Sequence, residues 1–176
     1  MKKRDRKRSI GKGLLVGLIG GLAASWAMNR FQDVWLTVSP SDASNEKETN
    51  REDSDVASED QDDATVKAAS AVSEGLFDHK LTPAEKKIAG PAVHYAVGAA
   101  AGMVYGVASE LMPEVTTGLG LPYGTAFWLV VDETIVPLLG LSKGPNKYPL
   151  STHAYALASH LVYGATVEGT RRILRD

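Results

Sequence analysis

The chain contains no cysteine, which excludes disulfide bonds, thiolate metal sites and cysteine nucleophiles. It also lacks the short motifs of common enzyme classes, because it has no nucleophile elbow, no phosphate-binding loop and no His-Glu-x-x-His sequence. No basic patch on a folded domain points to nucleic acid, because the basic residues adjoin an apolar run. We therefore expect a protein that is not an enzyme and that uses no cofactor, bound metal or nucleic acid.

Charge is scarce over long stretches and concentrated in two others. Seven of the first 12 residues are lysine or arginine, and ten acidic residues lie between Asp42 and Asp63. The mean hydropathy of -0.12 is therefore an average over strongly polar and strongly apolar segments. Residues 37–81 are too polar to bury a core, so we expect a mostly disordered acidic loop with a short helix near 64–75.

Four apolar segments are each close to the ~20 residues that cross a bilayer as a helix. They are residues 13–36, 82–112, 119–141 and 150–170, the second with an N-terminal extension that opens on a Thr82–Glu85 capping box. The sequence thus predicts an all-α protein with four transmembrane helices. A soluble bundle is the alternative, although it needs a polar face that these segments lack. The first segment also resembles a signal peptide, which leaves cleavage open.

Basic residues near the ends of the spans predict the orientation of the chain. The basic segments 1–12 and 171–176 are expected in the cytoplasm, together with a short turn at 113–118. The acidic loop and residues 142–149 then lie on the outer side. Both termini are therefore predicted to be cytoplasmic.

Glycine recurs at every fourth residue in two of the predicted spans. The two series are Gly13, Gly17 and Gly21, and Gly98, Gly102 and Gly106. Because lipid gives helices no hydrophobic reason to associate, this spacing favours close approach of two backbones. We expect these glycines at helix contacts; the functional alternative is an interface that slides or gates.

An internal repeat links the second and fourth spans. The pattern Val-Tyr-Gly-x-x-x-Glu occurs twice, at residues 104–110 and at residues 162–168. The first copy contains Tyr105, Gly106 and Glu110, and the second contains Tyr163, Gly164 and Glu168. If the match is not a chance one, the protein consists of two helical hairpins related by a pseudo-two-fold axis along the membrane normal, as in some transporters. Glu110 and Glu168 would then lie at equivalent depths near the cytoplasmic side.

Five ionisable residues of the spans are candidates for an intramembrane polar cluster. They are His94, Asp132, Glu133, His153 and His160. Ionisable side chains in a membrane are costly and often functional. Histidine beside a carboxylate suits a proton- or ion-responsive site, and the same side chains suit a metal. The structural alternative is hydrogen bonding between helices, with Pro137 producing a kink after the acidic pair.

Two segments resemble the YagU-like family of small bacterial inner-membrane proteins: YGTAFWLVVDETIVPLLGLS (123–142) and YPLSTHAYALASHLVYGATVEGTRR (148–172). The most specific parts are the Asp-Glu pair at 132–133, the Ser-x-His at 151–153 and residues 160–164. Residues 13–32 and 94–106 resemble the other spans of that family. The resemblance implies a bacterial inner membrane, suggests a role in acid survival and supplies no catalytic residues.

The leading expectation is an integral membrane protein that acts in acid or envelope stress through proton or ion handling. The alternative is a structural protein that binds other membrane proteins, or a second copy of itself, through the glycine faces and the acidic loop. The lipid bilayer is the expected partner in both cases.

Overall fold

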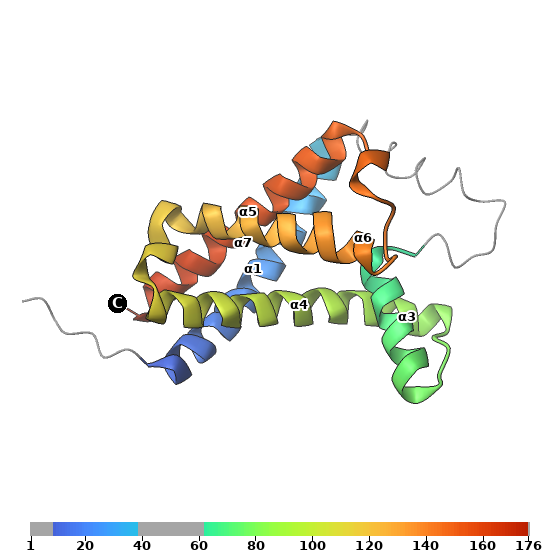
Figure 1. Cartoon of the computed structure of the whole chain (residues 1–176), viewed down its shortest axis with the longest axis horizontal. Coiled ribbons are helices and arrows are strands. Elements are labelled where there is room, and N and C mark those ends of the chain that lie inside the picture. Colours follow the sequence, from blue (N-terminus) through green and yellow to red (C-terminus); the bar gives the residue numbers. More distant parts are fainter. Residues whose placement is uncertain (1–8, 39–61, 176) are drawn as a thin grey trace, which may run out of the picture.

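The computed structural model describes residues 9–38 and 62–175, and all regular elements within these ranges are helical (Figure 1). The protein is therefore all-α, as predicted. Four long rods form the bundle: α1 (Ile10–Val38), α4 (Pro83–Leu111), α5 (Leu121–Val130) continued by α6 (Val136–Leu138), and α7 (Leu150–Arg175). Most of the predicted acidic loop, and most of the basic N-terminus, lie outside the described residues.

Two of the rods, α1 and α4, are long and apolar enough to cross a membrane. Each has 29 residues, or roughly 43 Å at about 1.5 Å per residue, which exceeds the ~30 Å hydrocarbon core of a bilayer. By length and composition, both are candidate membrane spans. By the same measure, no other helix of the described residues qualifies, so the other two spans stay predictions.

A shorter helix, α3 (Ala64–Phe77), packs against the beginning of α4 and crosses it at a steep angle (Figure 1). Asp63 caps α3 by accepting the N–H groups of Thr65 and Val66 at 2.8 and 2.9 Å. The helix continues past Gly75, where the sequence suggested an end. It stops before Asp78, which takes the left-handed conformation with φ 51°, a geometry that aspartate tolerates better than most residues.

α4 begins with the capping box that the sequence predicts. The Thr82 hydroxyl accepts the Glu85 N–H at 3.3 Å, and the Glu85 carboxylate accepts the Thr82 N–H at 2.7 Å. Glu85 lies ahead of the apolar part of the helix. The hydrogen bond from the Thr82 backbone, joined by one from the Thr82 hydroxyl, lowers the pKa of Glu85 because both favour the ionised carboxyl.

Two segments outside the predicted spans differ from their predicted form. The turn expected at 113–118 is a 3-10 segment, Pro113–Gly120, that contains left-handed Leu119 as well as two left-handed glycines. The basic tail expected after residue 170 is the last part of α7, which continues to Arg175. Arginine near the carboxyl end of a helix is stabilised by the helix dipole, which favours this extension.

α1 and α4 pack against each other through glycine. A Cβ atom added to any of three α1 glycines would collide with a carbonyl oxygen of α4. The facing pairs are Gly13 with Gly106, Gly17 with Gly102, and Gly21 with Gly98. The structure thus places all six glycines of the two series in one antiparallel contact. The absence of side chains lets the two backbones touch.

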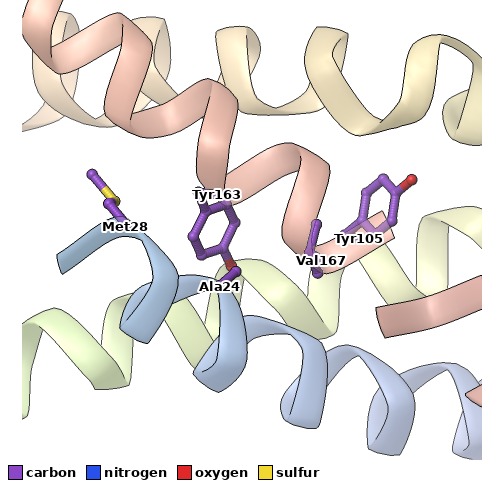
Figure 2. Packing of buried hydrophobic residues seen from close by; sticks show 5 residues of the cluster. All are labelled: Ala24, Met28, Tyr105, Tyr163 and Val167. Atoms are coloured by element: carbon purple, nitrogen blue, oxygen red, sulfur yellow. The ribbon is translucent and has the colours of Figure 1, made fainter. Parts of the chain in front are cut away.

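α5 and α7 cross in a similar way. A Cβ atom at Gly120 would collide with the carbonyl oxygen of Gly164, and one at Gly124 with that of His160. α1 also packs along α7, where Gly20 faces Val167. The buried apolar core between α1, α4 and α7 consists of Ala24, Met28, Tyr105, Tyr163 and Val167 (Figure 2).

Side chains on α1 are distributed in the opposite way to those of a soluble helix. Its buried positions are Gly13, Val16, Gly17, Gly20, Gly21, Ala24, Ser25 and Met28, which are mostly small. Its exposed positions include Leu14, Leu15, Ile19, Leu22 and Trp26, and Leu15 and Trp26 are each 59% exposed. A soluble helix turns its large apolar side chains inward. The outer face of α1 is therefore an apolar surface.

Candidate functional site

Asp132 and Glu133 lie in a π-turn, Val131–Ile135, that joins α5 to α6. The Val136 N–H bonds to the carbonyl oxygen of Val131, five residues back, directly before Pro137, which has no N–H to donate. The Thr134 hydroxyl donates to the Leu129 carbonyl oxygen at 2.8 Å. The sequence predicted a kink here but not this turn, a form that often accompanies functional sites.

Glu133 pairs with His153 of α7. The carboxylate Oε1 lies 2.7 Å from the ring Nδ1, and the ring Nε2 lies 3.0 Å from the Pro145 carbonyl oxygen. Because a carbonyl only accepts, Nε2 carries a proton. Nδ1 faces the carboxylate directly, so the arrangement is a histidine–carboxylate pair that links the π-turn to α7.

Asp132 faces His160 without a hydrogen bond to it. Its carboxylate Oδ2 is 3.7 Å from the His160 Nδ1, which is beyond hydrogen-bond distance. That Nδ1 lies 2.9 Å from the Ala156 carbonyl oxygen in its own helix, to which it donates. His160 is buried, and its ring packs edge-to-face with the Phe127 ring, with the two ring centroids 5.1 Å apart. Asp132 therefore stands beside a histidine whose nearer nitrogen is already engaged.

All five residues of the predicted polar cluster line one cavity of about 940 Å³. It lies at the end of the bundle where α1 ends and α4 and α7 begin, next to the start of α3 and the loop 142–149. Two buried polar atoms of its lining residues, Ser25 Oγ and His94 Nε2, have no hydrogen-bond partner within the described residues. The residues that line the cavity thus carry both paired and unpaired polar groups.

The described part of the chain contains no group of three or more histidine, aspartate or glutamate side chains arranged to hold a metal ion. Glu133 and His153 are bound to each other, and His160 turns its Nδ1 to a backbone carbonyl. The metal alternative for this cluster therefore receives no support from the geometry.

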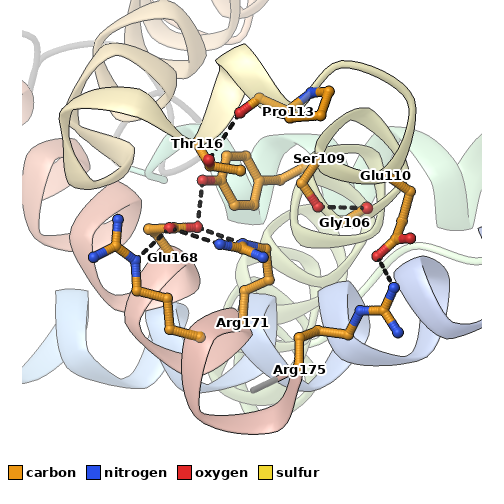
Figure 3. A network of polar contacts seen from close by, with 10 residues as sticks. Gly106, Ser109, Glu110, Pro113, Thr116, Glu168, Arg171 and Arg175 are labelled. Atoms are coloured by element: carbon orange, nitrogen blue, oxygen red, sulfur yellow. Dashed lines mark hydrogen bonds and ion pairs between the residues drawn. The ribbon is translucent and has the colours of Figure 1, made fainter. Parts of the chain in front are cut away.

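Glu168 anchors a polar network at the opposite end of the bundle (Figure 3). Its carboxylate accepts hydrogen bonds from the Tyr105 hydroxyl at 2.7 Å, the Arg171 Nε at 2.6 Å and the Arg172 Nε at 2.6 Å. Glu168 is 1% exposed, and a carboxylate buried to this degree needs such partners. The two arginines follow it at i+3 and i+4, a spacing that sequence analysis could have used to pair them.

Glu110 lies at the same end and is paired separately. It forms an ion pair with Arg175 (Figure 3). Its other oxygen accepts the Ser9 N–H at 3.1 Å. The bond to Ser9 ties the beginning of α1 to the end of α4. The two repeated carboxylates thus lie at one end of the bundle, each neutralised by arginine from α7, and away from the cavity.

Fold and site together define an all-α protein with two helices long and apolar enough to cross a membrane and a histidine–carboxylate cavity at one end of its bundle. A family model described as a protein of unknown function (DUF1440) matches residues 75–169, more than half of the chain, and the chain belongs to this family. The matched region contains the whole polar cluster but not α1. No curated protein and no solved structure matches the chain.

Proposed function

We propose that the protein is a four-span integral membrane protein that handles protons or ions at its histidine–carboxylate cavity. The observation that carries the membrane assignment is the inverted packing of α1, with glycine inside and leucine, isoleucine and tryptophan outside. Other elements share this outer surface, since Val104 of α4 is 63% exposed and Leu138 of α6 is 80% exposed. Hydrocarbon accommodates such a surface, whereas water does not.

The α5–α6 rod and α7 complete the four spans in this proposal. The rod from Leu121 to Leu138 is roughly 27 Å long at about 1.5 Å per residue, close to the ~30 Å that a span must cover. α7 is 26 residues long and more polar, but His160 and Glu168 are buried inside the bundle. Ionisable side chains in membranes face the protein interior in this way.

The two glycine crossings support the proposed relation between the two hairpins. The contact between α1 and α4 and the contact between α5 and α7 have the same register. The pair Gly13–Gly106 corresponds to Gly120–Gly164. The next pair, Gly17–Gly102, corresponds to Gly124–His160. The same register pairs Tyr105 with Tyr163 and Glu110 with Glu168. The proposal therefore keeps the pseudo-two-fold axis, with both termini in the cytoplasm and the cavity open to the outer side.

The proton role is supported by the Glu133–His153 pair and by Asp132 beside His160. Histidine and carboxylate groups exchange protons in the range that an acidified outer compartment reaches. This chemistry agrees with the acid-survival role and bacterial inner-membrane location that the YagU-like resemblance implies. We therefore propose an acid-stress function through proton movement rather than through a catalysed reaction.

Two measurements test the proposal in order. After lysis without detergent, ultracentrifugation should bring the full chain down with the membranes; recovery of the intact chain in the supernatant overturns the assignment. The purified protein in liposomes that contain a pH-sensitive dye should then acidify the lumen after an external acid jump. We expect Asp132→Asn to slow this flux and Glu114→Gln, at the other end of the bundle, to leave it unchanged. Equal rates with and without protein overturn the proton role.

The structural alternative has no observation in its favour. The glycine faces that it needs for partners already contact each other within the chain. Most of the acidic loop lies outside the described residues, so nothing about its partners follows from the structure.

A further inference from the structure

We propose that the cavity binds a small organic cation, an ammonium group on an apolar body, with Asp132 as its counter-charge. The inference rests on the proposed function because it assigns a ligand class to the same cavity. It requires that the cavity bind the ligand, but it does not require that the protein move protons.

Four carboxylates line the cavity, and three of them are engaged elsewhere. The engaged ones are Asp62 with Lys86 at 2.5 Å, Asp63 with the N–H groups that it caps, and Glu133 with His153 at 2.7 Å. Asp132 is the fourth, and it has no hydrogen bond to any described residue. Its side chain is 36% exposed, so the carboxylate is accessible from the cavity. The cavity therefore presents one carboxylate that still has room for a partner.

The positive side chains on the wall do not supply this partner. Lys67 and Lys143 line the cavity, but each is already engaged in an interaction of its own. His160 approaches Asp132 to 3.7 Å but donates its Nδ1–H to the Ala156 carbonyl oxygen, and His153 pairs with Glu133. The positive group that best complements Asp132 would thus come from a ligand.

Two residues of the cavity lining, Ser25 and His94, carry unpartnered polar atoms. Ser25 is only 1% exposed, and its hydroxyl oxygen has no hydrogen-bond partner within the described residues. His94 Nε2 also has no hydrogen-bond partner within the described residues. Both atoms are covered by the protein, so the group that an ammonium can reach directly is the Asp132 carboxylate, whose side chain is 36% exposed. An anion would find only repulsion at Asp132.

The remaining wall suits an apolar body. Met28, Val97, Phe127, Tyr155 and Tyr163 line the cavity, and the Phe127 and Tyr163 rings lie 5.0 Å apart by centroids. Aromatic faces attract organic cations as well as apolar groups. The volume of about 940 Å³ falls in the range of small-molecule sites and far exceeds the size of a bare metal ion. We therefore favour an organic over an inorganic cation.

A matched ligand series tests this inference on the full-length wild-type protein, purified in detergent at neutral pH. The probes are 2-phenylethylammonium, the neutral 2-phenylethanol and the anionic phenylacetate, and isothermal titration calorimetry measures their affinities. We expect the ammonium to bind at least tenfold more tightly than the alcohol and phenylacetate not to bind. Equal affinities of ammonium and alcohol, or no binding of the ammonium, overturn the inference.

Two variants then locate the site. Asp132→Asn should weaken binding of 2-phenylethylammonium at least tenfold, and Glu114→Gln, which removes the same charge at the opposite end of the bundle, should leave it unchanged. Unchanged binding by a folded Asp132→Asn protein overturns the inference. The wild-type ligand series decides the matter if that variant does not fold. A protein that binds the ammonium but moves no protons in liposomes refutes the proton role alone.

Discussion

The hydroxyl of Tyr105 donates a hydrogen bond of 2.7 Å to the carboxylate of Glu168, 63 residues further along the chain (Figure 3). Both side chains are fully buried, at 0% and 1% exposed. Each belongs to a different copy of the repeated Val-Tyr-Gly-x-x-x-Glu motif. The other tyrosine of the repeat, Tyr163, donates instead to the Gly98 carbonyl oxygen at 2.5 Å. The two copies therefore connect α4 and α7 through different acceptors.

This difference predicts unequal effects of removing the two hydroxyl groups. Tyr105→Phe takes a donor from a buried carboxylate and should lower the free energy of unfolding by about 2 kcal/mol, as for hydrogen bonds to charged groups. Tyr163→Phe removes a bond to a neutral carbonyl and should cost about 1 kcal/mol. Reversible denaturation of both variants in detergent measures the two values. A larger loss for Tyr163→Phe would contradict this account of the network.

The glycine contact between α1 and α4 predicts a strong position dependence of alanine substitution. Gly17→Ala places a methyl group against the Gly102 backbone and should destabilise the protein by about 1–3 kcal/mol as the helices move apart. Gly169→Ala in α7 meets no atom within 4 Å and should be neutral or stabilising by up to about 1 kcal/mol. Thermal denaturation in detergent compares the two variants. Similar melting temperatures would show that the close contact contributes little.

The glycine spacing predicted which faces of α1 and α4 pack closely, because glycines four residues apart lie on one helix face and let another backbone approach it. It did not predict that Gly17 faces Gly102 and not another glycine of the series, since a four-residue period allows several registers. The all-α class and the capping box at Thr82 likewise followed from local sequence patterns. Those patterns depend on neighbouring residues alone.

The candidate site required three-dimensional information. Asp132, Glu133, His94, His153 and His160 were identifiable as costly groups in apolar segments. Their sorting into an acid–histidine pair at 2.7 Å and a longer contact at 3.7 Å depends on the π-turn before Pro137, which the sequence does not specify. The cavity depends on how α1, α4 and α7 diverge at one end. No local pattern encodes that divergence.

The capping box at the start of α4 predicts a local dependence on pH. The folded pKa of Glu85 is lowered, so its stabilising effect is complete above the ordinary pKa of glutamate and is lost as pH falls through the lowered value. Hydrogen exchange should show protection of the Thr82 amide at neutral pH that declines in acid. Glu85→Gln should remove most of this pH dependence. Protection that rises on acidification in the wild-type protein would contradict the assignment.

The four-span topology predicts which positions react with a membrane-impermeant maleimide in intact cells. Because the chain has no native cysteine, each single-cysteine variant reports one position. Lys143→Cys, in the loop beside the cavity, should be labelled from outside, and Glu114→Cys, in the 3-10 segment at the opposite end, only after the membrane is permeabilised. Leu15→Cys, on the outer face of α1, should resist labelling in both conditions, because the thiol would lie in hydrocarbon and the nucleophile that attacks maleimide is the hydrated thiolate. Labelling of both loop positions from outside would place an even number of spans between them and contradict the hairpin formed by α5, α6 and α7.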